Sequence, residues 1–309
     1  MAGPLARHCA ARRKCITGSS PTHLVKLPIY LLIIAGVLLS SAGAVAQNPN
    51  CYIFLCFGQS NMEGFPGIED QDKGPVDERF QMLAAVDFQN QDRTKGSWYP
   101  AVPPLCRPSS GLCPADYFGR TLAAGLPKNI NVGVVNVAVA GCKIELFEKD
   151  TFQTYAATAP KWITGTIATY SGNPYQHLVE MAKLAQKDGV IKGILLHQGE
   201  SNTNDKEWPA KVKSIYENLL SDLNLKAEQV PLLVGELANA DQQGACAGMN
   251  RIIGELPKTI PTSHVISSAG CGSRPDHLHF TPAGYRELGK RYGEKMLALL
   301  NLKAPASLK

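Results

Sequence analysis

The sequence of 309 residues lacks several features that would point to particular classes of protein. It has no Cys-x-x-Cys motif and no cluster of histidine with cysteine, so it offers no pattern typical of a zinc site. It has no internal repeat, low-complexity segment or linker, which argues against a repeat protein or a chain of several domains. No Asn-x-Ser/Thr sequon is present, which fits a bacterial product. No long apolar lid segment follows the N-terminal region, which argues against a lipid substrate.

Acidic residues are absent from residues 1–46, where five of the 31 lysine and arginine residues lie. A continuous apolar stretch, Leu27–Leu39, follows this basic part, and small residues lead to the sequence Ala-Val-Ala at 44–46. A basic segment, a short apolar core and an A-x-A site predict a secretory signal peptide, cleaved before Gln47. An uncleaved membrane anchor is the alternative, but the apolar core is shorter than the ~20 residues that span a bilayer. We therefore expect a secreted or periplasmic protein without stable membrane association after cleavage.

Residues 47–309 carry no excess of either charge, since 26 lysine and arginine residues face 26 aspartate and glutamate residues. A formally neutral chain gives no electrostatic reason to expect nucleic acid or an anionic membrane as a partner. We expect a substrate that is small, or neutral and polar. The length suits one sizeable α/β domain with its own core.

Residues 47–309 also contain an odd number of cysteines: Cys51, Cys56, Cys106, Cys113, Cys142, Cys246 and Cys271. In an exported protein we expect some of these to pair. Cys106 with Cys113 and Cys246 with Cys271 are candidate pairs, although spacing alone does not determine connectivity. The odd count leaves at least one thiol free.

Apolar runs typical of strands alternate with amphipathic runs typical of helices. The expected strands are 52–57, 80–86 (an extra edge strand), 131–139, 190–197, 230–237 and 264–268. The expected helices are 115–126, 174–187, 208–223, 246–256 and 282–300. This alternation predicts a mostly parallel sheet with helices on both faces. Right-handed crossovers then bring the carboxyl ends of the strands to one edge.

Compact polar motifs follow four of these strand regions, where open α/β folds build their sites. They are Gly58-Gln59-Ser60-Asn61, the glycine Gly141 in Val-Ala-Gly-Cys-Lys-Ile, Gln198-Gly199-Glu200-Ser201-Asn202, and Asp276-His277-Leu278-His279. Acyl transfer needs a nucleophile, a base, a carboxylate that orients the base, and donors for the oxyanion. The motifs contain all four kinds of group, which predicts a serine esterase.

In this order the motifs resemble those of the SGNH (GDSL-like) hydrolases, and within them the carbohydrate esterase family 6 / sialate O-acetylesterase-like group. The resemblance covers essentially all of 47–309, which would form one SGNH esterase domain, and it is strongest to bacterial acetylxylan esterases. It implies a three-layer α/β/α sandwich with a mostly parallel central sheet. It also implies an acetylated carbohydrate substrate, most of all acetylxylan, and a reaction that needs no metal or other cofactor.

The resemblance implies that Ser60 is the nucleophile, that His279 is the general base, and that Asp276 orients His279. The Asp-x-x-His spacing lets both side chains approach Ser60 from one loop. His277 lies in the same loop and is the rival base, but the family spacing favours His279.

The oxyanion donors implied by the resemblance are the backbone N–H groups of Ser60 and Gly141 and the side-chain amide of Gln198. Possible supporting residues are Glu200, Asn61 and Asn202. For Glu200 a buried structural hydrogen bond is favoured over direct help to the histidine. The two asparagines are expected to bond loop backbone.

Four aromatic residues are candidates for stacking on sugar rings, although a place in the core or as a partly exposed anchor is the favoured interpretation of each: Trp98, Tyr99, Trp162 and Trp208.

Three other functions fit parts of the pattern. The substrate could be another O-acetylated sugar, such as acetylated sialic acid. The chain could be a different acyl hydrolase of the same superfamily, a lipase or a thioesterase. It could also be a non-catalytic carbohydrate-binding protein, although binding alone would not need a base beside a serine.

Overall fold

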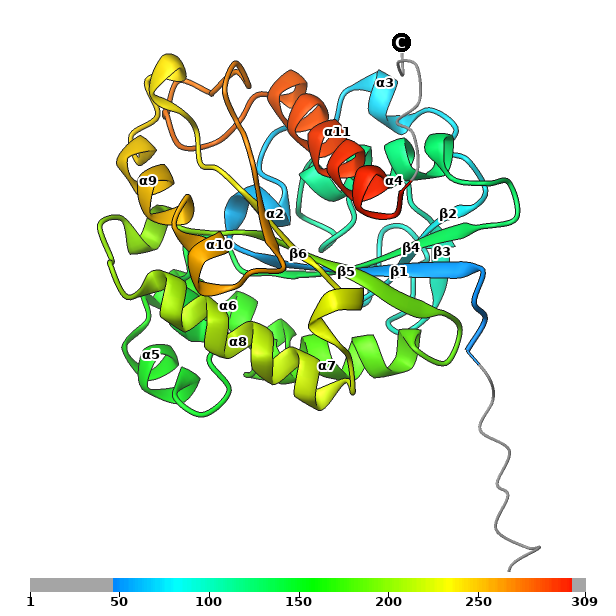
Figure 1. The fold of residues 1–309 in the computed structure, drawn as a ribbon, viewed down its shortest axis with the longest axis horizontal. Coiled ribbons are helices and arrows are strands. Elements are labelled where there is room, and N and C mark those ends of the chain that lie inside the picture. The colour runs from blue at the N-terminus through cyan, green and yellow to red at the C-terminus, as the bar shows by residue number, and fades with distance from the viewer. Residues whose placement is uncertain (1–46, 302–309) are drawn as a thin grey trace, which may run out of the picture. The chain divides into compact units, whose positions relative to one another are not determined.

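The computed structural model describes residues 47–301, so the predicted signal peptide at 1–46 lies outside the described residues. A seven-stranded sheet runs through this part of the chain, in the order β3-β2-β4-β1-β5-β6-β7 (Figure 1). The strands are β1 (Cys51–Gly58), β2 (Phe80–Leu83), β3 (Trp98–Pro100), β4 (Asn131–Ala138), β5 (Val190–His197), β6 (Leu232–Gly235) and β7 (Ser263–Ile266). β3 is antiparallel to β2, and every other neighbouring pair is parallel.

The centre of the sheet is buried on both faces. In β1 the run Ile53–Phe57 is at most 1% exposed, as expected for a strand with helices above and below it. Gly58 at the end of β1 pairs with Ala138 of β4 on one side and with His197 of β5 on the other. The three central strands therefore end in line, and the segments that follow them begin at the same edge.

Helices cover both faces of the sheet. They are α2 (Ser60–Glu63), α3 (Asp70–Lys73), α4 (Pro114–Gly125), α5 (Phe152–Thr158), α6 (Lys161–Thr169), α7 (Pro174–Ala185), α8 (Trp208–Asp222), α9 (Asn250–Ile253), α10 (Leu256–Thr259) and α11 (Pro282–Leu299). α4 and α11 pack together on one face, while α7 and α8 lie on the other (Figure 1). The predicted three-layer α/β/α sandwich is confirmed. Within residues 47–301 no helix is long and apolar enough to cross a membrane.

α11 can approach α4 closely because two glycines of α11 face α4. A Cβ on Gly289 would lie 2.5 Å from the carbonyl oxygen of Pro114, and one on Gly293 would lie 2.6 Å from Cβ of Thr121. α11 begins where the sequence predicts, since the hydroxyl of Thr281 accepts a hydrogen bond from the N–H of Gly284.

Two predicted elements differ from the structure. Segment 80–86 was expected at the sheet edge, but β2 lies one strand inside because the three-residue β3 pairs with it. The single helix expected at 246–256 is wrong: a 3₁₀ turn (Ala247–Met249) leads into α9, and α10 follows separately. Pro257 has no N–H to donate to the carbonyl of Ile253, and its ring blocks that carbonyl, so one continuous helix cannot form.

The expectation of disulfide bonds is wrong for the described part of the chain, where all seven cysteines are unpaired. Cys106 Sγ lies 3.4 Å from the hydroxyl of Tyr170. Cys113 Sγ instead accepts a hydrogen bond from Asn136 at 3.6 Å. Cys246 Sγ lies 3.8 Å from the carbonyl oxygen of Glu200, and Cys246 borders a cavity described below.

Candidate active site

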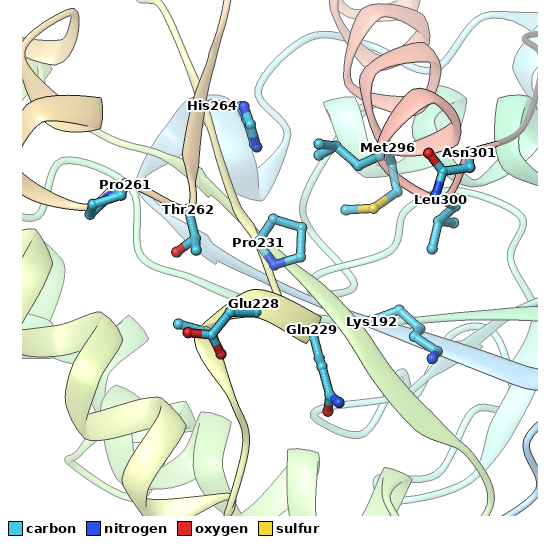
Figure 2. A pocket seen from close by; sticks show the side chains of 12 residues that line it. Lys192, Glu228, Gln229, Pro231, Pro261, Thr262, His264, Met296, Leu300 and Asn301 are labelled. Atoms are coloured by element: carbon cyan, nitrogen blue, oxygen red, sulfur yellow. The ribbon is translucent and has the colours of Figure 1, made fainter.

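One sizeable cavity lies away from the motifs. It has a volume of about 660 Å³ and is bordered by Pro231 and Thr262, which precede β6 and β7, and by Leu300, which follows α11 (Figure 2). It therefore opens at the amino ends of these strands. Neither serine nor cysteine is among the residues lining it.

A second cavity, of about 460 Å³, lies at the carboxyl ends of the strands and is lined by residues of the four motifs. We call it the Ser60 cavity. Its lining residues are Gln59, Ser60, Phe65, Ala140, Gly141, Trp162, Glu200, Ser201, Cys246, Leu278 and His279. Between residues 47 and 301 no group of three or more His, Cys, Asp or Glu side chains is arranged to hold a metal ion.

A tight turn between β1 and α2 presents Ser60 to this cavity. Gly58 has φ +150°, and a Cβ there would lie 2.1 Å from the carbonyl oxygen of His197, so only glycine fits. The carbonyl of Gln59 then accepts hydrogen bonds from the N–H groups of Met62 and Glu63, both at 2.8 Å. These contacts start α2 at once and leave the Ser60 hydroxyl at the end of the strand.

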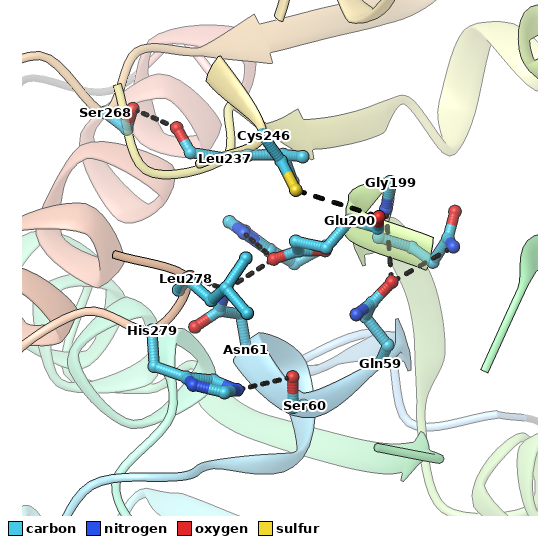
Figure 3. Close-up of polar contacts among 12 residues, drawn as sticks. Gln59, Ser60, Asn61, Gly199, Glu200, Leu237, Cys246, Ser268, Leu278 and His279 are labelled. Atoms are coloured by element: carbon cyan, nitrogen blue, oxygen red, sulfur yellow. Dashed lines mark hydrogen bonds and ion pairs between the residues drawn. The ribbon is translucent and has the colours of Figure 1, made fainter. Parts of the chain in front are cut away.

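The structure brings Ser60, His279 and Asp276 into one hydrogen-bonded relay. His279 Nε2 lies 2.9 Å from Ser60 Oγ, and His279 Nδ1 lies 2.8 Å from Asp276 Oδ2 (Figure 3 shows the first contact). Asp276 Oδ1 accepts the backbone N–H groups of Leu278 and His279, each at 3.0 Å.

These contacts determine the charge of Asp276 and the tautomer of His279. Partial burial acts to raise the pKa of Asp276, but the hydrogen bonds from Leu278 and His279 outweigh it and hold that pKa at about 2. An ionised Asp276 accepts the Nδ1–H of His279, which leaves Nε2 free to accept the proton of the Ser60 hydroxyl.

The structure places His279, and not the rival His277, beside Ser60. The N–H of His277 donates to the carbonyl of Arg274, and its own carbonyl accepts from Ala245. With φ +56°, His277 turns the loop so that the next-but-one residue reaches the serine.

The ring of Phe65 covers one face of the His279 imidazole. The ring centroids are 3.8 Å apart and the planes differ by 15°. The guanidinium of Arg274 lies 5.5 Å from the centroid of the Phe65 ring. The stack restricts rotation of the imidazole out of line with Ser60. Sequence reasoning missed Phe65, which no motif marks.

Gly141 borders the same cavity on the side of β4. It has φ +69°, a conformation that favours glycine, and a Cβ there would lie 2.1 Å from Cη2 of Trp162, so the indole ring lies directly against Gly141. Within residues 47–301 the backbone N–H groups of Ser60 and Gly141 donate to no other group. The structure thus brings these two expected donors together, unengaged.

Gln198 does not reach the cavity, contrary to the sequence-based expectation. It is fully buried, and its amide nitrogen donates to Asn202 Oδ1 at 2.7 Å and to Gln59 Oε1 at 3.1 Å. Its carbonyl accepts the indole N–H of Trp208 at 2.6 Å. With its donors engaged in the interior, Gln198 supports the site from behind.

Gln59 is the amide at the cavity wall, and sequence reasoning missed it although it lies inside the first motif. Its Oε1 accepts from Gln198 Nε2, from the N–H of Gly199 at 3.4 Å and from the N–H of Ser201 at 3.3 Å. Figure 3 shows this oxygen turned toward Gly199 and the amide nitrogen on the opposite side. Within the described residues Gln59 Nε2 donates to no protein group, so it is a free donor beside Ser60.

Glu200 and Asn61 support the loop that carries His279. Asn61 Nδ2 donates to Glu200 Oε1 and, at 3.0 Å, to the carbonyl of Leu278, while Tyr285 donates to Asn61 Oδ1. Burial raises the pKa of Glu200 to about 7. His197 Nε2 lies 4.0 Å from Glu200, but burial lowers the pKa of His197 to about 3, so the contact is not an ion pair at neutral pH.

Asn202 connects segments beneath the Gly141 turn. Its Oδ1 accepts the N–H of Ile144 at 2.8 Å, and its Nδ2 donates to Glu145 at 2.9 Å and Asp205 at 3.1 Å. The expected backbone contact of Asn202 is therefore present, with acidic side chains added.

Comparisons with known proteins identify the family and the fold. Residues 50–298 match the family model described as carbohydrate esterase, sialic acid-specific acetylesterase. A protein from Arabidopsis thaliana is similar in structure, with a TM-score of 0.62 at 21% identity over 81% of this chain and 99% of that one. NanS gives a TM-score of 0.60 at 17% identity, over 82% of this chain and 99% of that one.

A carbohydrate acetylesterase from Xanthomonas citri gives a TM-score of 0.54 at 19% identity, over 80% of this chain but 56% of that longer one. At these identities the structural likenesses establish the fold, and the family model establishes the family. This chain belongs to the carbohydrate esterase family of sialic acid-specific acetylesterases, and it is a carboxylic ester hydrolase with an SGNH-type fold.

Proposed function

We propose that this chain is a secreted serine esterase that removes O-acetyl groups from acetylated polysaccharide, with acetylxylan as its main substrate. The observation that carries the proposal is the relay of Ser60, His279 and Asp276, with contacts of 2.9 and 2.8 Å at the wall of an open cavity. These are the distances at which a histidine takes a proton from a serine hydroxyl.

In the proposed reaction, Ser60 Oγ attacks the acetyl carbonyl carbon while His279 Nε2 takes the hydroxyl proton. Asp276 stabilises the imidazolium that forms. When the tetrahedral intermediate collapses, the bond to the sugar oxygen breaks and that oxygen receives the proton from His279. Water then attacks the acetyl-serine in the same way, releasing acetate and restoring the Ser60 hydroxyl.

Three donors would hold the oxyanion: the backbone N–H groups of Ser60 and Gly141, and the side-chain Nε2 of Gln59. We assign the third place to Gln59 because it lines the cavity with this nitrogen free, whereas Gln198 is buried with its donors engaged. Each donor of this kind contributes on the order of 10²–10³ in turnover.

The cavity wall favours a neutral sugar. None of its described lining residues is a lysine or arginine. A carboxylate on the substrate would therefore meet no cation at the wall itself. The resemblance to acetylxylan esterases and the predicted signal peptide agree with a polysaccharide acted on outside the cytoplasm.

Hydrolysis of O-acetylated sialic acid is the second candidate, supported by the family description and by Arg274. The guanidinium of Arg274 forms no ion pair within residues 47–301 and packs over Phe65, next to His279. A cation in this place is able to bind the carboxylate of a sugar acid just outside the cavity.

The test is acetate release by purified residues 47–309 from acetylated xylan and from O-acetylated sialic acid, with Ser60→Ala and Arg274→Met beside the unaltered protein. Release from xylan that is lost in Ser60→Ala and kept in Arg274→Met supports the proposal. Release from sialic acid alone, weakened by Arg274→Met, establishes the second candidate. A Ser60→Ala protein that is folded by circular dichroism and still active refutes the serine mechanism.

A further inference from the structure

Two large hydrophobic side chains in the described part of the chain are exposed, and both line the Ser60 cavity. Phe65 is 51% exposed and Trp162 is 66% exposed. Apolar surface that stays in water forgoes the stabilisation that burial would give. Their presence at one cavity indicates that they contact a ligand there.

Buried residues near Trp162 in α6 (Lys161–Thr169) fix the helix to the core and so hold the exposed indole at the cavity. In α6 the side chains of Ile163 and Ile167, four residues apart, are 1% and 6% exposed and bind the helix to the core. Tyr170, at the end of the helix, is fully buried, and its hydroxyl donates to the carbonyl of Ala138 at 3.2 Å. Trp162 precedes Ile163 by one position, about 100° around the helix, and is therefore turned outward.

The indole of Trp162 lies against Gly141 at the wall of the Ser60 cavity. Its Cη2 is the atom that a Cβ on Gly141 would meet, at 2.1 Å. Gly141 supplies one of the proposed oxyanion donors, and Phe65 covers His279. One aromatic ring thus borders the oxyanion side of Ser60, and the other borders the side from which the leaving oxygen is protonated.

We propose that Trp162 is the stacking platform of a sugar subsite, and that its indole face binds the C–H face of a pyranose ring in the acetylated saccharide. This inference rests on the proposed function. A pyranose has an apolar face of C–H groups, which carry partial positive charge, and the face of an aromatic ring is negative. Ser201 lies in the same wall; its hydroxyl donates to the carbonyl of Gly141 at 2.9 Å, and its oxygen can accept a hydrogen bond from a sugar hydroxyl.

The other aromatic candidates are excluded by position. Trp208 is fully buried and donates to Gln198. Trp98 and Tyr99 lie in the edge strand β3, where they bond Asp188 and the N–H of Thr94 at 2.9 and 2.8 Å.

The test compares an acetylated xylo-oligosaccharide with ethyl acetate, an ester that has neither a sugar nor an aromatic ring. For Trp162→Leu, the ratio of kcat/KM on the saccharide to that on ethyl acetate falls on the order of tenfold, mainly through KM. Trp162→Phe keeps an aromatic face and restores most of the ratio. Thr164→Ala, an exposed position on the same helix outside the cavity, is the matched control and leaves the ratio unchanged.

Other outcomes overturn the inference. An unchanged ratio in Trp162→Leu, with good activity of the unaltered protein on the saccharide, refutes the subsite and leaves the proposed function standing. Equal ratios in Trp162→Leu and Trp162→Phe show that apolar volume alone matters and refute stacking. If the unaltered protein hydrolyses ethyl acetate but no acetylated saccharide, both proposals fail.

Discussion

Replacing Gln198 with alanine removes the side chain that connects the nucleophile turn to the interior. The indole N–H of Trp208, which is fully buried, is left without its acceptor. Asn202 Oδ1 keeps a second donor, the N–H of Ile144. Gln59 Oε1 loses one donor but retains the backbone N–H groups that follow Gln198.

The structure therefore predicts a loss of stability larger than the loss of activity. An unsatisfied buried donor costs about 1–3 kcal/mol, and the space left by the side chain raises the total to about 2–4 kcal/mol. For a domain of this size each kcal/mol lowers Tm by roughly 2–4 °C, so Tm should fall by roughly 5–15 °C. Because Gln59 keeps most of its contacts, we expect kcat to fall less than about tenfold.

Gln59→Ala is the matched change, and the opposite result is expected for kcat. It removes the free Nε2 donor at the cavity wall, so kcat should fall on the order of 10²–10³. KM should change little, because the donor acts on charge that develops in the transition state. This change also leaves the backbone N–H groups of Gly199 and Ser201 without their acceptor, so we expect a stability cost of about 1–3 kcal/mol beside the loss of kcat.

The assay pairs thermal unfolding, followed by circular dichroism, with kcat on a simple aryl acetate for both variants. The opposite pattern would refute the structural assignment. A Gln198→Ala protein with an unchanged Tm and a kcat reduced 10²–10³-fold, beside an active Gln59→Ala protein, would make Gln198 the direct donor as the resemblance implies.

Two further changes test the acidic residues. Asp276→Asn should lower kcat on the order of 10⁴-fold, because the side-chain amide cannot accept from both the loop backbone and His279 Nδ1, and the His279 tautomer that faces Ser60 is then lost. The fall in kcat is measured on an aryl acetate, and a loss below tenfold contradicts the relay. The lowered pKa of Asp276 adds stability that is present at neutral pH and declines as pH falls from about 3.8 toward about 2, and Asp276→Asn should abolish this decline in acid unfolding curves. Burial raises the pKa of Glu200 from 4.5 to about 7, so the folded state holds this proton more tightly and stability falls as pH rises across that range. Glu200→Gln keeps an acceptor for Asn61, so it should raise Tm more at pH 8 than at pH 5, with a difference equivalent to about 1–3 kcal/mol of unfolding free energy. An equal rise in Tm at both pH values contradicts the reasoning.

Much of the fold could be predicted because its central strands are long and apolar. The bounds of β5 were predicted to the residue, and those of β1 and β4 within one residue at each end. β3 was not predicted, because three residues carry no periodic signal and the strand exists only where β2 offers an edge. α5 and α6 were missed because few of their side chains are buried, so their amphipathic pattern is weak.

The residues of the relay could also be predicted, since Ser60 follows a buried strand and the Asp-x-x-His motif positions Asp276 and His279 within one loop. Which amide faces the cavity could not. Gln59 and Gln198 both follow central strands directly, and the difference between them is the buried indole of Trp208, which turns one amide inward.

The sequence by itself determined the kinds of chemical group, their order along the chain and the family, because these depend on strand ends and local motifs. Only the tertiary structure decided that Gln59 and not Gln198 reaches the cavity, and that Trp162 and not Trp208 is exposed there. A side chain's direction is set by the surfaces packed against it, and those surfaces come from segments far apart in the sequence. The local sequence pattern therefore does not predict the direction in which each polar or aromatic side chain points.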